Sequence, residues 1–345
     1  MTQPRHAIFL DPSSEHFLGD RLFDMQDSRL NRDGTLLPFA RLKARFASMG
    51  VPVHTADVLR SGAVLAQTNH YWSLGMRSGY QELLGRDDIR LRGFVLFEPP
   101  LVEPAMYADL PNLMQCFENV FVHNVDGDGY ALQDAESTKL KKLDWPQPYD
   151  SEVEPYWSRR DRENRLVVIA GNHNPKFRHP EFYSKRIQAV GALAALDAVD
   201  LYGRGWDRWW SKQSAWWPYW RHFGAIRRAY RGSCEAKLEV LSRYRFSLCF
   251  ENTPMRGYLT EKLFDCLYAG TVPLYLGAPD IAELVPPDAY VDVRRYSDFR
   301  TLFREVNAMP DEAWQRMREA GKEFLRGEGK RRYFDALIDI CTLPA

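Results

Sequence analysis

The sequence has few cysteines, no net charge and no long hydrophobic run. The five cysteines in 345 residues are odd in number and lack metal-ligand spacing, which argues against a zinc site or a disulfide scaffold. Acidic and basic residues balance at 46 each, which argues against a general nucleic-acid binder. The longest apolar run, residues 189–196, falls short of the ~18 residues that a membrane span needs.

The N-terminus also lacks the long apolar stretch of a signal peptide, and we expect a reduced, cytoplasmic protein. Residues 7–11 instead predict the first strand of a sheet. Cys249 and Cys266 lie inside apolar patterns and are expected to be small core residues.

The chain is long enough for two domains, since a single core stops growing near ~250–300 residues. Segments typical of strands alternate with segments of helical spacing, which predicts an α/β fold with parallel sheets. A charged, proline-containing stretch at 139–162 suits a linker, so we place an N-terminal domain at 1–155 and a C-terminal domain at 156–345. The expected strands are 7–11, 51–53, 94–97, 119–123, 166–170, 199–202 and 246–250, with a further strand that the chain enters at Pro273. The expected helices are 36–49, 181–196 and 311–325.

Polar residues follow the buried strand predicted at 246–250. Glu251 and Asn252 would lie at its carboxyl end, the edge where open α/β sheets bind ligands. The alternative is structural: Glu251 could pair with a nearby arginine, and Asn252 could close a turn.

A helix is predicted from Thr260, an acceptable N-cap, to Gly270, which would end it in a left-handed conformation. Glu261 suits the positive helix end, whereas Lys262 there costs roughly 0.3–1 kcal/mol. A bound anion, for which phosphate is the natural candidate, would remove that cost. Alternatively, Lys262 bends into solvent or pairs with Glu261 or Asp265.

These motifs together resemble a known family. Phe-Glu-Asn at 250–252, Tyr-Leu-Thr-Glu-Lys-Leu at 258–263 and Ala-Gly-Thr-Val-Pro at 269–273 are similar to the donor-binding signature of the α1,3/4-fucosyltransferases, glycosyltransferase family 10, in its soluble bacterial form. Phe-Glu-Pro-Pro at 97–100 resembles the family's Glu-Ser-Pro element, with proline in place of serine.

The resemblance implies a GT-B fold, an α/β architecture in which two Rossmann-like domains face each other across a cleft. The C-terminal domain would bind GDP-β-L-fucose and the N-terminal domain a glycan or lipopolysaccharide-type acceptor. Transfer would invert the anomeric centre and give an α-L-fucoside, with an α1,3-type linkage expected. The protein would work in the cytoplasm or at the periphery of the inner membrane.

The resemblance also implies site residues. Glu98 would be the catalytic base and Glu261 a second catalytic carboxylate, with Glu103, His123 and His173 left open as other bases. Because no Asp-x-Asp pair lies in a loop suited to a metal, we expect no required cofactor or metal; stimulation by a divalent metal stays open. The donor would be bound by Asn172, Arg186, Gly203, Arg204, Glu251, Asn252, Tyr258, Thr260 and Lys262.

The segment 204–231 matches no motif of that family. It holds six of the ten tryptophans and seven basic residues, with Asp207 as its one acid. It could be an aromatic lid, a sugar-binding wall, or a docking patch for an anionic partner or a membrane surface.

Two functional alternatives also stay open: a transferase that uses another GDP-sugar, and a non-catalytic carbohydrate-binding protein.

Overall fold

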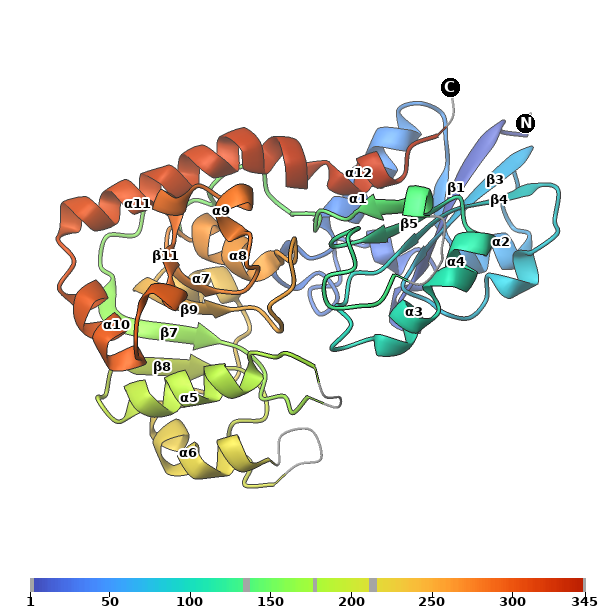
Figure 1. The fold of residues 1–345 in the computed structure, drawn as a ribbon. Coiled ribbons are helices and arrows are strands. Elements are labelled where there is room, and N and C mark those ends of the chain that lie inside the picture. Colours follow the sequence, from blue (N-terminus) through green and yellow to red (C-terminus); the bar gives the residue numbers. More distant parts are fainter. Residues whose placement is uncertain (1–2, 133–136, 176–178, 211–215, 344–345) are drawn as a thin grey trace. The chain divides into compact units, whose positions relative to one another are not determined.

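The structure of this protein is a computed structural model that describes residues 3–132, 137–175, 179–210 and 216–343 (Figure 1). The chain divides into two compact units. Unit 1 comprises residues 1–148 together with 332–345, and unit 2 comprises residues 149–331.

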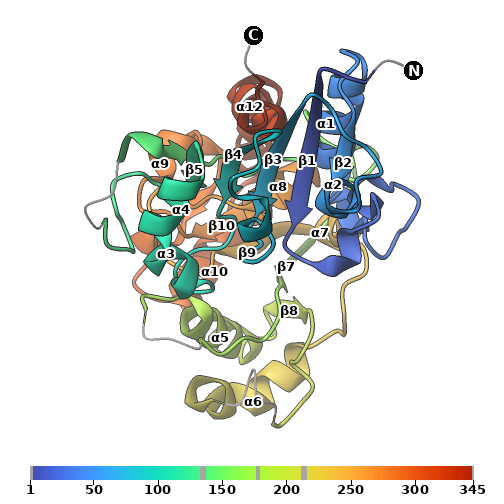
Figure 2. The ribbon, with the colours of Figure 1, turned by 90° about the vertical axis from the view of Figure 1, so that its right-hand side faces the viewer.

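Unit 1 is built on a parallel sheet with the strand order β2-β1-β3-β4-β5-β6. Side chains alternate between the two faces of a strand, so Ile8 and Leu10 pack on one face of β1 and Phe9 on the other. Figure 2 shows α1 and α2 beside β1 and β2, and α3 and α4 beside β5. The strands are β1 His6–Pro12, β2 Val53–Thr55, β3 Thr68–Leu74, β4 Ile89–Val95, β5 Asn119–Val122 and β6 Leu140–Lys142; the helices are α1 Leu37–Ala47, α2 Ala56–Ser61, α3 Pro104–Ala108, α4 Leu110–Cys116 and α12 Ala336–Ile340.

The C-terminal helix α12 corrects the predicted domain boundaries. Leu337 and Ile340 are buried in the core of unit 1, and the Trp72 indole donates a hydrogen bond to the Ile340 carbonyl at 3.2 Å. The chain therefore returns to unit 1 at its end, and unit 2 begins at 149, not at 156. Local patterns could not show this return, because the buried partners of α12 lie far away in the sequence.

Unit 2 is a second parallel sheet, with the order β11-β10-β9-β7-β8. After β7 the chain adds β8 on one side and β9 on the other, so the order reverses between β7 and β9. Ligands bind at such a switch point in open α/β sheets. The strands are β7 Glu163–Ile169, β8 Val199–Tyr202, β9 Tyr244–Phe250, β10 Val272–Leu276 and β11 Val291–Asp292; the helices are α5 Tyr183–Ala194, α6 Trp217–Ala229, α7 Lys237–Leu241, α8 Glu261–Tyr268, α9 Ile281–Leu284, α10 Phe299–Asn307 and α11 Asp311–Phe324, followed by a π-helical segment Leu325–Phe334.

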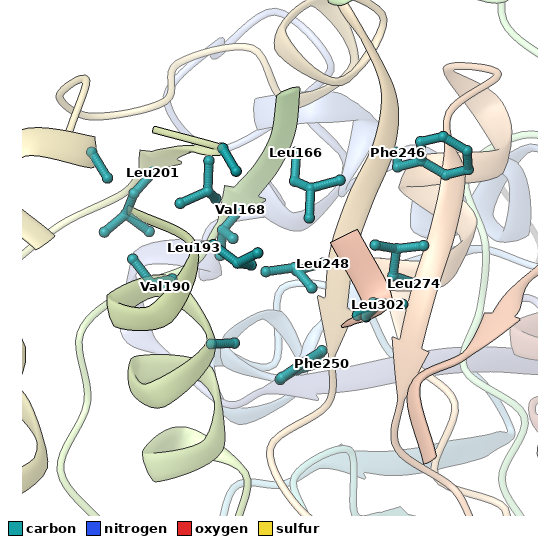
Figure 3. Packing of buried hydrophobic residues seen from close by; sticks show 14 of the residues in the cluster. Leu166, Val168, Val190, Leu193, Leu201, Phe246, Leu248, Phe250, Leu274 and Leu302 are labelled. Carbon is teal, nitrogen blue, oxygen red and sulfur yellow. The ribbon is translucent and has the colours of Figure 1, made fainter. Parts of the chain in front are cut away.

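The core of unit 2 lies between this sheet and its helices. Figure 3 shows Leu166, Leu248 and Leu274 from neighbouring strands, packed beside Val190 and Leu193 of α5. These side chains have essentially no exposed surface, and burial of apolar surface contributes about 25 cal/mol per Å². The packed strands hold the loops at their carboxyl ends in fixed positions.

Several predicted elements are confirmed. The strand at 199–202 has the predicted bounds, the helix at 311–325 corresponds to α11, and Gly270 has the expected left-handed φ of 67°. Cys249 and Cys266 are buried, as predicted. Three strands were missed, among them the two-residue β11. β3 carries buried polar residues such as Asn69, whose amide bonds to Ala66 and Asp88, and β6 lies inside the stretch interpreted as a linker.

Among the described residues, none of the helices combines the length and the apolar character required to cross a membrane.

Candidate functional site

Most of the predicted donor-site residues gather at the carboxyl edge of the sheet of unit 2. Glu251 and Asn252 follow β9, Asn172 follows β7, and Gly203 follows β8. Because the strands are parallel, these loops lie at the same edge of the sheet. Helices α5 and α8 begin there too, and their first turns place further polar side chains beside the loops.

Glu251 is the centre of this site. Its side chain has no exposed surface, and its main-chain N–H donates to the Leu276 carbonyl at 2.8 Å. Its carboxylate accepts hydrogen bonds from the Thr260 N–H at 2.9 Å, the Thr260 hydroxyl at 2.8 Å and the Lys262 ammonium at 3.1 Å. Charge-assisted bonds of this kind stabilise a buried charge. Glu251 therefore fixes the start of α8 relative to the end of β9.

Thr260 and Lys262 form the N-terminus of α8 with Glu261. Thr260 caps the helix, and its hydroxyl also accepts a bond from the Lys262 ammonium at 2.9 Å. Burial disfavours the Lys262 cation, but the carboxylates of Glu251 and Glu261 outweigh this and raise its pKa. The predicted electrostatic cost of Lys262 is thus offset by two carboxylates, while Asp265 pairs with Lys237 instead at 2.9 Å.

Glu261 is the more accessible of the two carboxylates, with a side chain 34% exposed. Burial alone would raise its pKa, but the neighbouring cations Lys262 and Lys237 lower it to about 2. Glu261 is therefore ionised at neutral pH. Lys262 is 26% exposed, so both side chains can reach a ligand at the N-terminus of α8.

Arg186, on the first turn of α5, binds the main chain at the carboxyl end of β9. Its guanidinium is buried and donates to the main-chain oxygens of Phe250 at 2.5 Å and Glu251 at 3.3 Å. Burial lowers the Arg186 pKa, and the nearby Tyr183 and Glu251 counteract this. Arg186, which was predicted to bind the donor, thus also orders the loop that carries Glu251.

Asn252 and Tyr258 belong to the loop between β9 and α8, and this loop contacts the start of α5. The Asn252 carbonyl accepts from the Phe182 N–H at 2.9 Å, and its amide donates to the Tyr258 hydroxyl at 3.5 Å. Tyr258 is only 1% exposed. These contacts tie the loop after β9 to the start of α5.

A second group of predicted residues joins the loops after β7 and β8. The Asn172 N–H donates to the Arg204 carbonyl at 2.9 Å, and its amide donates to the Gly205 carbonyl at 3.0 Å. Within the described part of the chain, the buried Asn172 Oδ1 has no hydrogen-bond partner. Gly203 has a φ of 133°, and a Cβ there would meet the Ala170 oxygen at 2.0 Å. The Arg204 side chain is exposed.

Two residues that support the site were not predicted. The Asp280 carboxylate accepts the Gly257 N–H at 2.9 Å and so anchors the loop between β9 and α8. Lys237 contributes the second positive charge beside Glu261. Neither residue gave a local signal in the sequence, because the groups that they contact are close in space and distant along the chain.

The predicted base Glu98 belongs to unit 1, shortly after the carboxyl end of β4, and is exposed. The Tyr107 hydroxyl donates to its main-chain oxygen at 3.1 Å and holds the turn. Glu103 precedes α3 at its N-cap position. His123 is fully buried and contacts the Phe97 carbonyl at 2.7 Å, so it is less accessible than Glu98.

Comparison with known proteins finds a family model that matches part of the chain. Residues 176–318 match the model described as glycosyltransferase family 10 (fucosyltransferase), C-terminal. This part of the chain is therefore a glycosyltransferase family 10 domain. The match includes α5, the strand β9 and all of α8, and so contains the Glu251–Lys262 group.

Curated fucosyltransferases resemble parts of the chain. An α-(1,3)-fucosyltransferase C of Drosophila melanogaster is 43% identical over 234 residues, which cover 63% of this chain and 48% of that protein. The α-(1,3)-fucosyltransferase FucT of Helicobacter pylori is 40% identical over 76 residues, which cover 22% of this chain and 16% of that protein. The chain therefore spans less than half of the length of either relative.

Solved structures show the fold. A crystal structure titled α1,3-fucosyltransferase matches with a TM-score of 0.51 and 16% identity, covering 93% of this chain and 83% of that one. Anabaena HepE in complex with UDP and glucose matches with a TM-score of 0.52 and 12% identity, covering 97% and 96%. With its two parallel α/β units, the chain has the predicted GT-B fold.

Proposed function

We propose that this chain is a glycosyltransferase that moves L-fucose from GDP-β-L-fucose to a hydroxyl of a glycan acceptor, with inversion and an α1,3-type linkage. The acceptor would be a surface glycan of the lipopolysaccharide type. The observation that carries this proposal is the arrangement of Glu251, Thr260 and Lys262 at the N-terminus of α8, inside the region matched by the family model.

The start of α8 suits the diphosphate of the donor. Breaking the sugar–phosphate bond leaves negative charge on GDP, which a helix N-terminus and a cation stabilise. The Lys262 ammonium is held in place by Glu251 and is still partly exposed. In this role the protein supplies the positive charge with its own residues.

Glu261 would act on the sugar side of the same bond. Its ionised carboxylate can accept hydrogen bonds from fucose hydroxyls or stabilise the positive charge that develops at the anomeric carbon. Glu251 would work through its neighbours, because its own oxygens are already bound by Thr260 and Lys262.

Glu98 would be the base. The acceptor oxygen attacks the anomeric carbon, its proton passes to the Glu98 carboxylate, and the bond to the diphosphate breaks as GDP leaves. General base catalysis is worth about 10²–10⁴-fold in rate. An exposed carboxylate after a strand of unit 1 is accessible for this transfer.

A donor screen tests the proposal. The protein is incubated with GDP-fucose, GDP-mannose and UDP-sugars, with and without glycan acceptors, and the products are read by mass spectrometry. We expect release of GDP and a mass gain of one deoxyhexose on the acceptor with GDP-fucose alone. If the protein turns over a different nucleotide sugar and does not turn over GDP-fucose, the proposed donor is wrong and that sugar takes its place.

Lys262→Ala should lose most of the donor affinity, because the ammonium that would face the diphosphate at the start of α8 is removed. Lys262→Arg is the matched control and should retain part of it. GDP binding is measured by calorimetry, and a saturating ligand at 100 times its Kd should stabilise the wild type by about 2.7 kcal/mol. Equal GDP affinity in wild type and Lys262→Ala would remove Lys262 from the donor site.

Glu98→Gln should keep the wild-type affinity for GDP but lower kcat by about 10²–10⁴-fold. Glu103→Gln, five positions further along the chain, is the control and should keep its rate. A normal kcat in Glu98→Gln together with a loss in Glu103→Gln would assign the base to Glu103.

The second candidate is a non-catalytic carbohydrate-binding protein. One observation favours it: Lys262 is already paired with Glu251 and Glu261, as a purely structural lysine would be. Such a protein would bind glycans without binding GDP. A thermal shift with glycans and none with GDP would support this candidate over the transferase.

A further inference from the structure

Helix α6 has an outer face that the proposed function does not use. Tyr219, Ile226 and Ala229 point into the core of unit 2, and α6 packs against α5 on the side away from the sheet (Figures 1 and 2). The residues on the opposite face follow the helical period. They are exposed and consist of Trp217, Trp220, Arg221, Gly224, Arg227 and Arg228.

Tryptophans gather at the start of this face. Trp209, Trp210 and Trp217 are 61%, 67% and 71% exposed, and Trp220 is 36% exposed. The rings of Trp209 and Trp220 stack with their centroids 6.3 Å apart, and the Trp220 indole donates to the Trp209 carbonyl at 3.0 Å. By contrast, Trp206 is buried. Grouped and exposed aromatic side chains of this size mark an interaction surface.

Arginines surround these tryptophans. Arg208, Arg221, Arg227 and Arg228 are exposed, and Asp207 is the one acid in the described residues from 204 to 231. Arg227 and Arg228 donate hydrogen bonds to the main-chain oxygens of Asp207 and Gly224, and neither forms an ion pair with a carboxylate of the described residues. We define the Trp–Arg surface as Trp209, Trp210, Trp217 and Trp220 with Arg208, Arg221, Arg227 and Arg228.

We propose that the Trp–Arg surface docks onto a bilayer that contains anionic lipids. Tryptophan prefers the boundary between headgroups and acyl chains, because its ring is apolar and its N–H is polar. Arginines beside it complement phosphate headgroups, and a helix with one apolar-basic face lies in the plane of such an interface.

The geometry favours a membrane over a nucleic acid. Proteins that stack single-stranded bases on aromatic rings do so along a positively charged groove. The Trp–Arg surface instead lies on the outer face of a surface helix, and the whole chain has no net charge. The proposal concerns where the protein binds and stands independently of the transferase reaction.

Vesicle co-sedimentation tests this inference. The full-length protein is mixed with vesicles of phosphatidylcholine alone, or of phosphatidylcholine with one third phosphatidylglycerol, at about 0.1 M ionic strength, where charges are screened beyond about 10 Å. We expect at least tenfold stronger partitioning to the anionic vesicles, falling as salt is added.

Two double variants probe the two parts of the surface. Arg227→Glu with Arg228→Glu should reduce binding to anionic vesicles at least tenfold, and so should Trp210→Ser with Trp217→Ser. The matched control is Arg300→Glu with Arg304→Glu, which changes two exposed arginines on α10 by the same charge. It should bind like the wild type, and circular dichroism and melting temperature verify that each variant is folded.

The inference fails if folded wild type binds neither vesicle, or if the α6 and α10 charge variants bind equally well. It also fails if the tryptophan variant keeps full binding, since charge alone would then explain the result. Binding to single-stranded RNA that the α6 variants abolish, with no vesicle binding, would assign the surface to nucleic acid instead.

Discussion

At the scale of single residues, the buried Glu251 carboxylate organises the candidate site. One alternative from the sequence was that Glu251 pairs with an arginine. Its ion-pair partner is Lys262. The nearby Arg186 instead donates hydrogen bonds to main-chain oxygens. A lysine is normally disfavoured at the positive N-terminus of a helix, and here the carboxylate of Glu251 offsets that repulsion. This contact links the chain before and after the 253–259 loop.

Removing the Glu251 carboxylate should lower the free energy of unfolding markedly. Glu251→Ala removes the nearer of the two carboxylates beside the Lys262 ammonium and leaves the Thr260 N–H without its partner. Breaking a buried pair costs about 3–5 kcal/mol in the free energy of unfolding. The control Glu261→Ala removes a partly exposed carboxylate and should cost about 0–1 kcal/mol. Urea denaturation gives both values; similar losses in the two variants would contradict the central role of Glu251.

At the scale of elements, the turn after β8 depends on a glycine. Gly203 brings its backbone against Ala170 after β7, so the loops that carry Asn172 and Arg204 can meet. The sequence analysis named Gly203 as a donor-site residue, but the need for a glycine there became clear only from the neighbouring strand. A side chain has no room there, and the φ of 133° is strained for any other residue.

Gly203→Ala should therefore destabilise unit 2 by roughly 2–3 kcal/mol, from backbone strain and displacement of the β7 loop. Gly224→Ala is the matched control, because it lies within α6 with open space around its Cβ position. It should stabilise the helix by about 0.5–1 kcal/mol. Thermal and urea unfolding measure both changes, and opposite signs are expected.

At the scale of the whole molecule, each unit has its own sheet and core, yet unit 1 is completed by the last residues of the chain. The two units also share a response to acid. The pKa values of four histidines, His70 and His123 in unit 1 and His173 and His222 in unit 2, are lowered by burial first, with nearby cations adding to the effect.

Stability should accordingly fall as the pH drops below about 6.5. The unfolded chain takes up protons at an ordinary histidine pKa of 6.5, whereas His70 resists protonation until about 4 and His123 until about 3. Acid therefore favours the unfolded state over this window, and the stability is fully present above it. Urea midpoints at pH 7.5, 6.0 and 5.0 measure the loss.

His70→Gln should flatten that dependence, while His16→Gln, at an exposed position, should leave it unchanged. A midpoint that stays constant from pH 7.5 to 5.0 in the wild type would refute this account of the buried histidines.

The sequence by itself determined the α/β class, the strand that ends at Glu251, the capped start of α8 and the left-handed Gly270, because each depends on neighbours within a few positions. Only the tertiary structure decided that Lys262 pairs with Glu251, that Arg186 binds the end of β9 and that α12 belongs to unit 1. These features depend on packing between distant segments, which local periodicity does not encode. The outward face of α6 needed both sources. The sequence showed its cluster of tryptophans and arginines, and the fold determined which of these side chains are exposed to solvent.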